Sequence, residues 1–211
     1  VAGSTDGVFV GNTNSGASDA YVAMFDGAGS LQWVRQFGAS ADSSTSTGNM
    51  ALADDGSIYV VGTTTGAFPG QTLTSQNDAF LAKLDADGEP MWFRQMGSGE
   101  RSSMRAVAVD AHGNVLVTGD TMGELVPGQQ AGGVDAFVVK YAPDGELVWA
   151  RQFGTELSDR PTSLVVDSLG AVIVVGETQG ELPVAARSGE RDLFVADLNG
   201  TTGEVSGFWQ Y

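Results

Sequence analysis

Aspartate and arginine recur at regular places along this chain, and they are the residues whose types and spacing could do chemistry. The repeated acids are Asp19, Asp78, Asp135 and Asp192, and the repeated cations are Arg35, Arg94 and Arg151. If the repeats surround an axis, each set forms a ring of like charges. Such a ring needs solvent, a bound cation or oppositely charged partners.

Each repeated arginine follows a tryptophan by two residues and precedes a phenylalanine or methionine by two, as in Trp92-Phe93-Arg94-Gln95-Met96. In an extended strand these three side chains share one face. The guanidinium could therefore stack on the aromatic ring and bond a carboxylate of its own repeat or of the next one. We interpret the aspartates and arginines as mainly structural pairs rather than as a ligand site. Trp209 takes the arginine's place in the last copy and is the exception to this pairing.

No catalytic residue is predicted. The single histidine, His112, stands in a turn where the equivalent copies have Asp55 and Leu169, so the repeat does not require it. No nucleophile accompanies it in a recognisable pattern, which favours a solvated turn residue over a general base. No nucleophile elbow, Walker loop or zinc-protease helix motif is found in the sequence.

No metal site or cofactor is predicted either. Asp85-Ala86-Asp87-Gly88 partly resembles a calcium loop, but calcium takes six to eight oxygen ligands. The copies, Asp26-Gly27-Ala28-Gly29 and Ala142-Pro143-Asp144-Gly145, keep the turn and lose the paired acids. Asp and Gly are the residues that a tight hairpin requires, so the interpretation is structural.

The tryptophans have two possible roles. Trp33, Trp92 and Trp149 could form a stacking surface for sugars, or they could fill the core between repeats. We favour the core, because large aromatic side chains dominate protein interiors.

The elements that position these residues follow one period, with 57 residues from Asp78 to Asp135 and again from Asp135 to Asp192. Each unit shows four short strands, a to d, separated by turns rich in glycine and aspartate, which predicts antiparallel hairpins. One such unit has two apolar faces, and it can bury both only by stacking radially on its neighbours. The predicted fold is an all-β β-propeller of about four four-stranded blades, either complete or part of a larger propeller.

The chain is predicted to be a single domain, 1–211, with blades at approximately 1–38, 49–97, 104–154 and 162–211. The first blade is expected to lack strand a, to expose Val8 to Asn12 as an edge, and to lack the loop segment seen as Phe68-Pro69-Gly70. We therefore expect blade 1 to be completed by additional blades of a longer chain or to border a protein partner.

The repeated motifs resemble the SBBP β-propeller repeat of bacteria. They are Asp-Ala-Phe, then Trp-x-Arg-Gln-Phe-Gly, then a run such as Ala108-Val109-Asp110 followed by Gly113-Asn114-Val115 and Val117-Thr118-Gly119. The resemblance implies a propeller fold in a secreted or cell-surface bacterial protein, extracellular or periplasmic. It implies no catalytic residues.

The net charge of the chain excludes two classes of partner. The chain has 26 acidic and 10 basic residues and a formal net charge of −16, a field that repels phosphate backbones and anionic lipid surfaces. No apolar run is long enough to span a bilayer. Neither nucleic-acid binding nor membrane insertion is expected.

Three functions remain open at this point. The first is a non-catalytic binding or scaffold module that recognises protein or glycan through loops on one rim. The loops meant are those between strands b and c, at Thr65 to Asn77, Met122 to Val134 and Gln179 to Arg191. The second is a propeller-type hydrolase or lyase with a site in the channel. The third is a structural subunit of a larger assembly.

Overall fold

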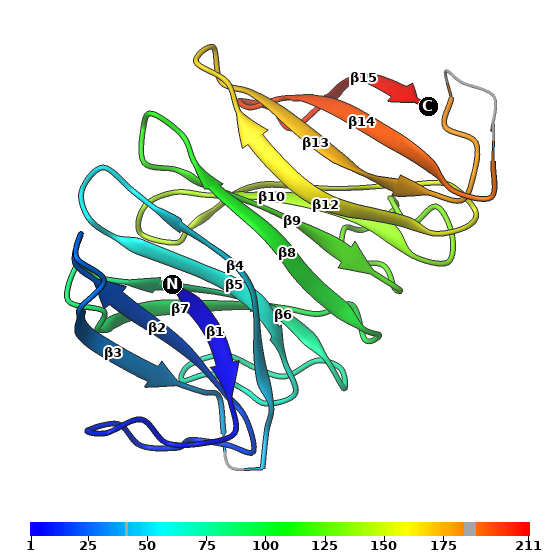
Figure 1. Cartoon of the computed structure of the whole chain (residues 1–211). Helices are drawn as coiled ribbons and strands as arrows, with labels where there is room; N and C mark the ends of the chain where they lie inside the picture. Colours follow the sequence, from blue (N-terminus) through cyan, green and yellow to red (C-terminus); the bar gives the residue numbers. More distant parts are fainter. Residues whose placement is uncertain (41, 184–188) are drawn as a thin grey trace.

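The chain folds into four antiparallel sheets that follow one another in sequence order (Figure 1). A computed structural model describes residues 1–40, 42–183 and 189–211. The described residues form strands and turns and contain no helix. The architecture is that of a β-propeller, as the repeats predict, and we call the four sheets blades 1 to 4.

Blades 2, 3 and 4 each contain the four predicted strands, joined as a simple meander. Their bounds are β4 (Thr45–Leu52), β5 (Ile58–Thr64), β6 (Asp78–Leu84) and β7 (Pro90–Met96); β8 (Ser102–Val109), β9 (Val115–Thr121), β10 (Asp135–Tyr141) and β11 (Leu147–Phe153); and β12 (Asp159–Val166), β13 (Ala171–Thr178), β14 (Asp192–Asn199) and β15 (Val205–Gln210).

Strand a of each complete blade begins before the boundary expected from the sequence, at Thr45, Ser102 and Asp159. A β-bulge explains the difference. The register of strand a against strand b shifts between Thr47 and Asn49, between Met104 and Ala106, and between Pro161 and Ser163. The extra residue interrupts the alternation of apolar side chains on which the sequence-based boundary relied.

Blade 1 corrects one expectation. It has three strands, β1 (Ala2–Thr5), β2 (Asp19–Phe25) and β3 (Leu31–Phe37), and β1 pairs with β2 at the place of strand b. Val8 to Asn12 is therefore loop rather than edge strand, and the side chain of Val10 is 99% exposed.

The loop before β2 is also complete. Gly11 has a positive φ of 80°, as Gly70 has at 73°, and Asn12 donates its backbone N–H to the Phe9 carbonyl as Gln71 does to Phe68. Phe9-Val10-Gly11 thus takes the place of Phe68-Pro69-Gly70, so the predicted deletion was wrong. The valine in place of the proline hid the match.

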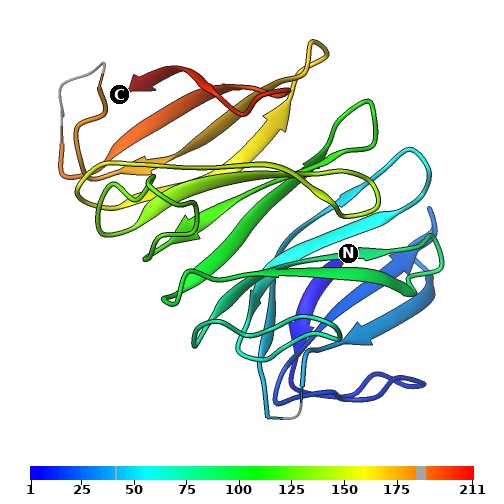
Figure 2. The same ribbon diagram turned by 180° about the vertical axis from the view of Figure 1, so that it is seen from behind.

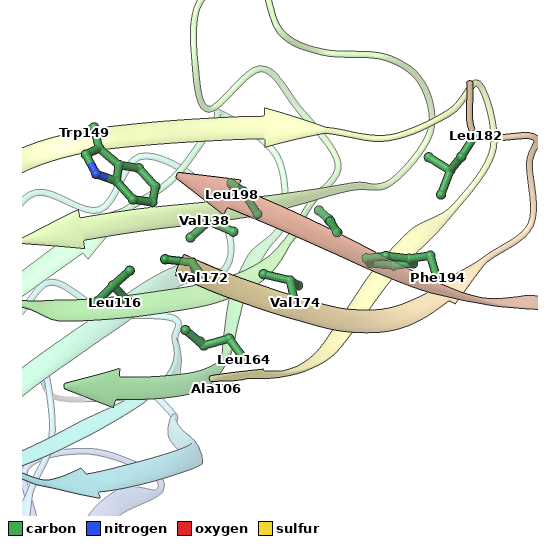
Figure 3. Close-up of a cluster of buried hydrophobic side chains, with 12 residues drawn as sticks. Ala106, Leu116, Val138, Trp149, Leu164, Val172, Val174, Leu182, Phe194 and Leu198 are labelled. Atoms are coloured by element: carbon green, nitrogen blue, oxygen red, sulfur yellow. The ribbon is translucent and has the colours of Figure 1, made fainter. Parts of the chain in front are cut away.

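The cores lie between the blades. Trp149 and Val138 of blade 3 pack with Leu164, Val172 and Phe194 of blade 4 in one cluster (Figure 3). Two further clusters join blade 2 to blade 3 and blade 1 to blade 2. Blades 2 and 3 therefore bury both faces on their neighbours, as the radial stacking of a propeller requires.

The innermost strands lie side by side along the series, β1 next to β4, β4 next to β8, and β8 next to β12. Blades 1 and 4 stand at opposite ends of the series in both views (Figures 1 and 2). The four blades thus form an open arc, in which each end blade has a neighbour on one face only.

Candidate functional site

The repeated aspartates begin strand c of every blade and are buried. In blade 2 the Asp78 carboxylate accepts bonds from the backbone N–H of Thr74 at 2.8 Å and from Gln95 Nε2 at 3.0 Å. Asp19 and Asp135 are held in the same way, and Gln210 Nε2 donates to Asp192 at 2.8 Å. Each aspartate is thus enclosed within its own blade rather than facing a shared ring.

The glutamine after each repeated arginine ties the b–c loop to the sheet. Gln95 Oε1 accepts the Phe68 N–H at 3.2 Å, and Gln95 Nε2 also donates to the Gly66 carbonyl. Leu182 bonds Gln210 in the same way. Sequence reasoning missed this role, although Gln210 persists in blade 4, where the tryptophan and arginine of the motif are replaced.

The repeated arginines lie away from the repeated aspartates, which corrects the idea that the two form pairs. Each one reaches the c–d turn of the following blade instead. Arg35 Nε donates to Glu89 Oε1 at 2.7 Å, Arg94 Nε to the Gly145 carbonyl at 2.6 Å, and Arg151 Nη2 to the Thr202 carbonyl at 2.9 Å. Arg35 and Arg94 also lie over Trp33 and Trp92. The stacking part of the interpretation therefore matches the geometry of Arg35 and Arg94, and Arg35 also bonds a carboxylate of the next repeat, as the interpretation allowed.

The tryptophans pack between blades and do not form a platform. A Cβ added to Gly88 or Gly203 would lie 2.7 Å from Trp33 or 2.6 Å from Trp149, so each indole covers a turn glycine of the next blade. Trp149 Nε1 also donates to the Gly200 carbonyl at 3.2 Å. This geometry supports the core interpretation.

His112 lines a cavity of about 380 Å³ between the a–b turns of blades 2 and 3, together with Asp54, Asp55 and Asp110. Asp110 Oδ1 accepts the backbone N–H of His112 at 2.9 Å, so the acid shapes the turn. Asp85 does the same for the c–d turn by accepting the N–H groups of Asp87 and Glu89.

A second cavity, of about 510 Å³, opens where the inner strands converge. The bulged residues of all three, Gly48, Arg105 and Thr162, line it, which places it at the propeller channel. Ser103 also lines it and bonds Thr63 of the neighbouring blade at 2.7 Å between the hydroxyl oxygens. The cavity belongs to the rim that carries the b–c and d–a loops, since Asn77 and Arg101 come from them.

Blade 3 departs from the repeat at this cavity. Arg105 stands where blades 2 and 4 have Gly48 and Thr162, and its Nε donates to Asp120, which is 2% exposed. Arg101 is exposed, and the described part of the chain offers its guanidinium no hydrogen bond. Since a structural repeat does not need these departures, they mark the best candidate for a binding site.

The b–c loops nominated from the sequence border this rim. Met122 to Val134 is described throughout, whereas residues 184–188 of the third loop lie outside the described part of the chain. Among the described residues no group of three or more His, Asp and Glu side chains could hold a metal ion. No described helix is long and apolar enough to cross a membrane.

The repeat itself is recognisable. Residues 32–69 match the family described as SBBP, beta-propeller repeat. This segment is an SBBP repeat. It runs from β3 through β4 and β5 into the b–c loop, so it contains the tryptophan, arginine and glutamine of blade 1 together with the bulge of blade 2.

Two curated proteins resemble the SBBP-containing chain over much of its length. The regulatory protein FlaEY of Caulobacter vibrioides is 29% identical over 195 residues, covering 85% of this chain and 20% of FlaEY. An uncharacterized WD repeat-containing protein of Acanthamoeba polyphaga mimivirus is 24% identical over 157 residues, covering 66% of this chain and 11% of the viral protein. The chain therefore spans a small part of either relative.

A solved structure supports the fold. A protein of unknown function from Bacteroides caccae matches 90% of this chain and 53% of its own with a TM-score of 0.51 and 15% identity. That likeness concerns the fold alone.

Proposed function

We propose that this propeller is a non-catalytic recognition module that binds a segment of another protein at the rim formed by the b–c and d–a loops. The observation that carries the proposal is the channel cavity of about 510 Å³, where Arg101 and Arg105 break the repeat. Function commonly lies in loops held by a rigid scaffold, and here the scaffold is the set of inner strands.

The lining favours a polypeptide over a glycan. Hydroxyl, amide and guanidinium groups surround the cavity, supplied by Thr63, Asn77, Arg101 and Ser103 among others. These groups suit backbone carbonyls and carboxylate or amide side chains. None of the described residues that line the cavity is aromatic, and the tryptophans that could have stacked on sugar rings pack between blades.

One relative, FlaEY, is named a regulatory protein, and this name supports a role in recognition rather than catalysis. The family resemblance supports a secreted or cell-surface setting, which immunodetection of the protein in cell fractions of its source organism would test. A propeller-type hydrolase or lyase would need acids or histidines that act together in the channel. None of the described residues that line the cavity is an acid or a histidine.

The test is a selection of random peptides displayed on phage, run beside a glycan array, with the 211-residue chain as bait. We expect peptides with carboxylate or amide side chains to be enriched. Arg101→Gln should weaken their binding about tenfold, because it removes one charge-assisted hydrogen bond. Among the described residues the Arg101 side chain forms no hydrogen bond or ion pair, so this substitution breaks none within the fold.

Arg35→Gln is the matched control, since Arg35 lies on the outer strand of blade 1 and bonds Glu89 of a c–d turn, at the rim opposite the cavity. It should leave peptide binding unchanged. Binding of glycans alone, or peptides that bind Arg101→Gln as tightly as the unmodified chain, would contradict the proposal.

A further inference from the structure

Contacts from blade 2 to blade 3 and from blade 3 to blade 4 follow one rule in this propeller. A cation on strand c or d reaches the carbonyls of the next blade's c–d turn. Lys83 Nζ donates to the Pro143 carbonyl at 3.1 Å, and Lys140 Nζ donates to the Gly200 carbonyl at 2.9 Å. The repeated arginines reach the same turns, so two cations of each complete inner blade hold the turn of its successor.

Blade 4 reverses this chemistry on its outward face, the face turned away from blade 3. Asp197 lies opposite Gly207 in the sheet as Lys83 lies opposite Trp92 and Lys140 opposite Trp149, so a carboxylate replaces the lysine. Trp209 replaces the arginine. A Cβ on Gly207 would lie 2.9 Å from the Trp209 ring, so the indole covers the place that the motif's tryptophan fills elsewhere.

The Asp197 carboxylate is not satisfied within the described residues. Its Oδ1 is shielded from solvent and has no hydrogen-bond partner there. A buried carboxylate oxygen without a donor is costly, and a cation or N–H group supplied from outside would remove that cost.

A second acid stands on the same face. Glu177 is at the place of Thr63, whose hydroxyl bonds Ser103 of the next blade, and its side chain is 56% exposed beside Arg191. Blade 3 has an acid at this position as well, Asp120. Glu177 is paired with Arg191 and lies opposite Arg160 in the sheet, so Asp197 is the acid that distinguishes this face.

Apolar side chains surround these acids. Val165 is 54% exposed, Leu193 49% and Trp209 46%. Ala79 and Ala136, which are the equivalents of Leu193, are fully buried against the next blade. Figure 3 shows that Phe194, Val174 and Leu198 point the other way, into the interface with blade 3. An apolar sheet face of this kind marks an interaction surface.

We propose that the outward face of blade 4 binds a partner β-sheet that carries a lysine or arginine against Asp197. Apolar side chains provide most of the contact area between the two sheets, and the partner's cation donates a charge-assisted hydrogen bond to the Asp197 carboxylate. The net charge of −16 favours a basic partner at longer range. The inference does not depend on the proposed function of the rim.

A second copy of this chain does not fit that description. Its open blade, blade 1, would bring to Asp197 the c–d turn that begins at Asp26, whose carboxylate already accepts the N–H groups of Ala28 and Ser30. Carbonyls and another acid would then face the carboxylate, which is the arrangement that like charges oppose.

The experiment fuses an additional blade to the C-terminal end of the chain, so that it follows blade 4 as blade 3 follows blade 2. A copy of residues 97–154 is fused after Tyr211, because Tyr211 stands where Met96 stands before blade 3. One form keeps the copy unchanged, and the other carries Pro143→Lys within the copy, at the turn residue that Lys83 contacts. Docking of the appended blade is measured as its resistance to thermolysin under native conditions.

We expect the form with Pro143→Lys to be cleaved at least tenfold more slowly than the unchanged copy. Asp197→Asn in the host blade should remove most of that difference. Asp197→Lys should protect the unchanged copy instead, because it restores the contact found between blades 2 and 3, and it also shows that the copy folds.

Two results would overturn the proposal. One is equal protection of the unchanged copy and the Pro143→Lys copy, which would make the face a general apolar docking surface. The other is rapid cleavage of every fused form, which would mean that the face accepts no sheet. Random-peptide binding at the rim is a separate measurement, so either proposal can fail alone.

Discussion

Gln152 Nε2 donates to the Asp135 carboxylate at 2.8 Å, and both side chains are buried. The same glutamine also accepts the N–H groups of Leu125 and Val126 and donates to the Gly123 carbonyl. One side chain of the fourth strand therefore fastens the b–c loop and the third strand of a blade together. This bond recurs in all four blades, including the two that depart from the rest of the motif.

Gln152→Met should destabilise the chain by about 1–3 kcal/mol, because it leaves the buried Asp135 carboxylate and two loop N–H groups with fewer partners. Urea unfolding followed by circular dichroism measures the change. Gln32→Met, at an exposed glutamine of β3, is the control and should cost little. Equal effects of the two substitutions would show that the glutamine is not the residue that holds the loop.

Gly203→Ala should destabilise more than Gly170→Ala. Both glycines have positive φ, 71° and 85°, so both substitutions carry the cost of a left-handed alanine, about 1–2 kcal/mol. Only at Gly203 would the new methyl meet an indole, that of Trp149 at 2.6 Å, whereas nothing lies within 4 Å at Gly170. The difference in unfolding free energy between the two variants isolates the contact between blades 3 and 4. Identical values would argue against that contact.

Trp149→Ala should cost about 3–5 kcal/mol, as expected for a large buried aromatic side chain. Trp209→Ala, at a residue that is 46% exposed, should cost much less while blade 4's outward face is uncovered. Thermal unfolding of both variants is the measurement. A loss below 1 kcal/mol at Trp149, together with lost glycan binding, would restore the lectin interpretation.

Asp110→Asn should lower stability at neutral pH by an amount that fades in acid. Burial acts to raise the pKa of Asp110, but bonds from Asn114 and Lys140 and the turn N–H groups outweigh it, so the pKa lies below its ordinary 3.8. A depressed pKa means that the ionised form stabilises the fold above the unfolded pKa, and that this stability is lost as pH falls through the folded pKa.

Melting temperatures between pH 7 and pH 2 check this. The gap between the unmodified chain and Asp110→Asn should be constant above pH 5 and should close below pH 3.8. Asp87→Asn, at an exposed turn residue, is the control and should show no comparable gap. A gap that persists in strong acid would mean that the carboxylate charge contributes nothing.

Much of the fold could be predicted from the sequence, because the residues that recur in each repeat form turns and strands through local interactions. Turns such as Asp144-Gly145 need a residue of positive φ, and a continuous apolar run such as that of β10 needs two covered faces. These requirements act over a few residues, so they can be read one unit at a time. They determined the strands, the hairpins and the stacking of the blades.

Contacts across the fold had to come from the tertiary structure. Arg94 and Gln95 are neighbours in the motif but point to opposite faces of one strand, and only the packing of the blades decides that the glutamine meets Asp78 while the arginine meets the next blade. The true strand of blade 1, Ala2–Thr5, was hidden for a similar reason, since its identity rests on pairing with β2 and not on its own apolar pattern. The channel cavity and the reversed charge on blade 4 likewise depend on which side chains the arc brings together, because these contacts join residues that are far apart in the chain.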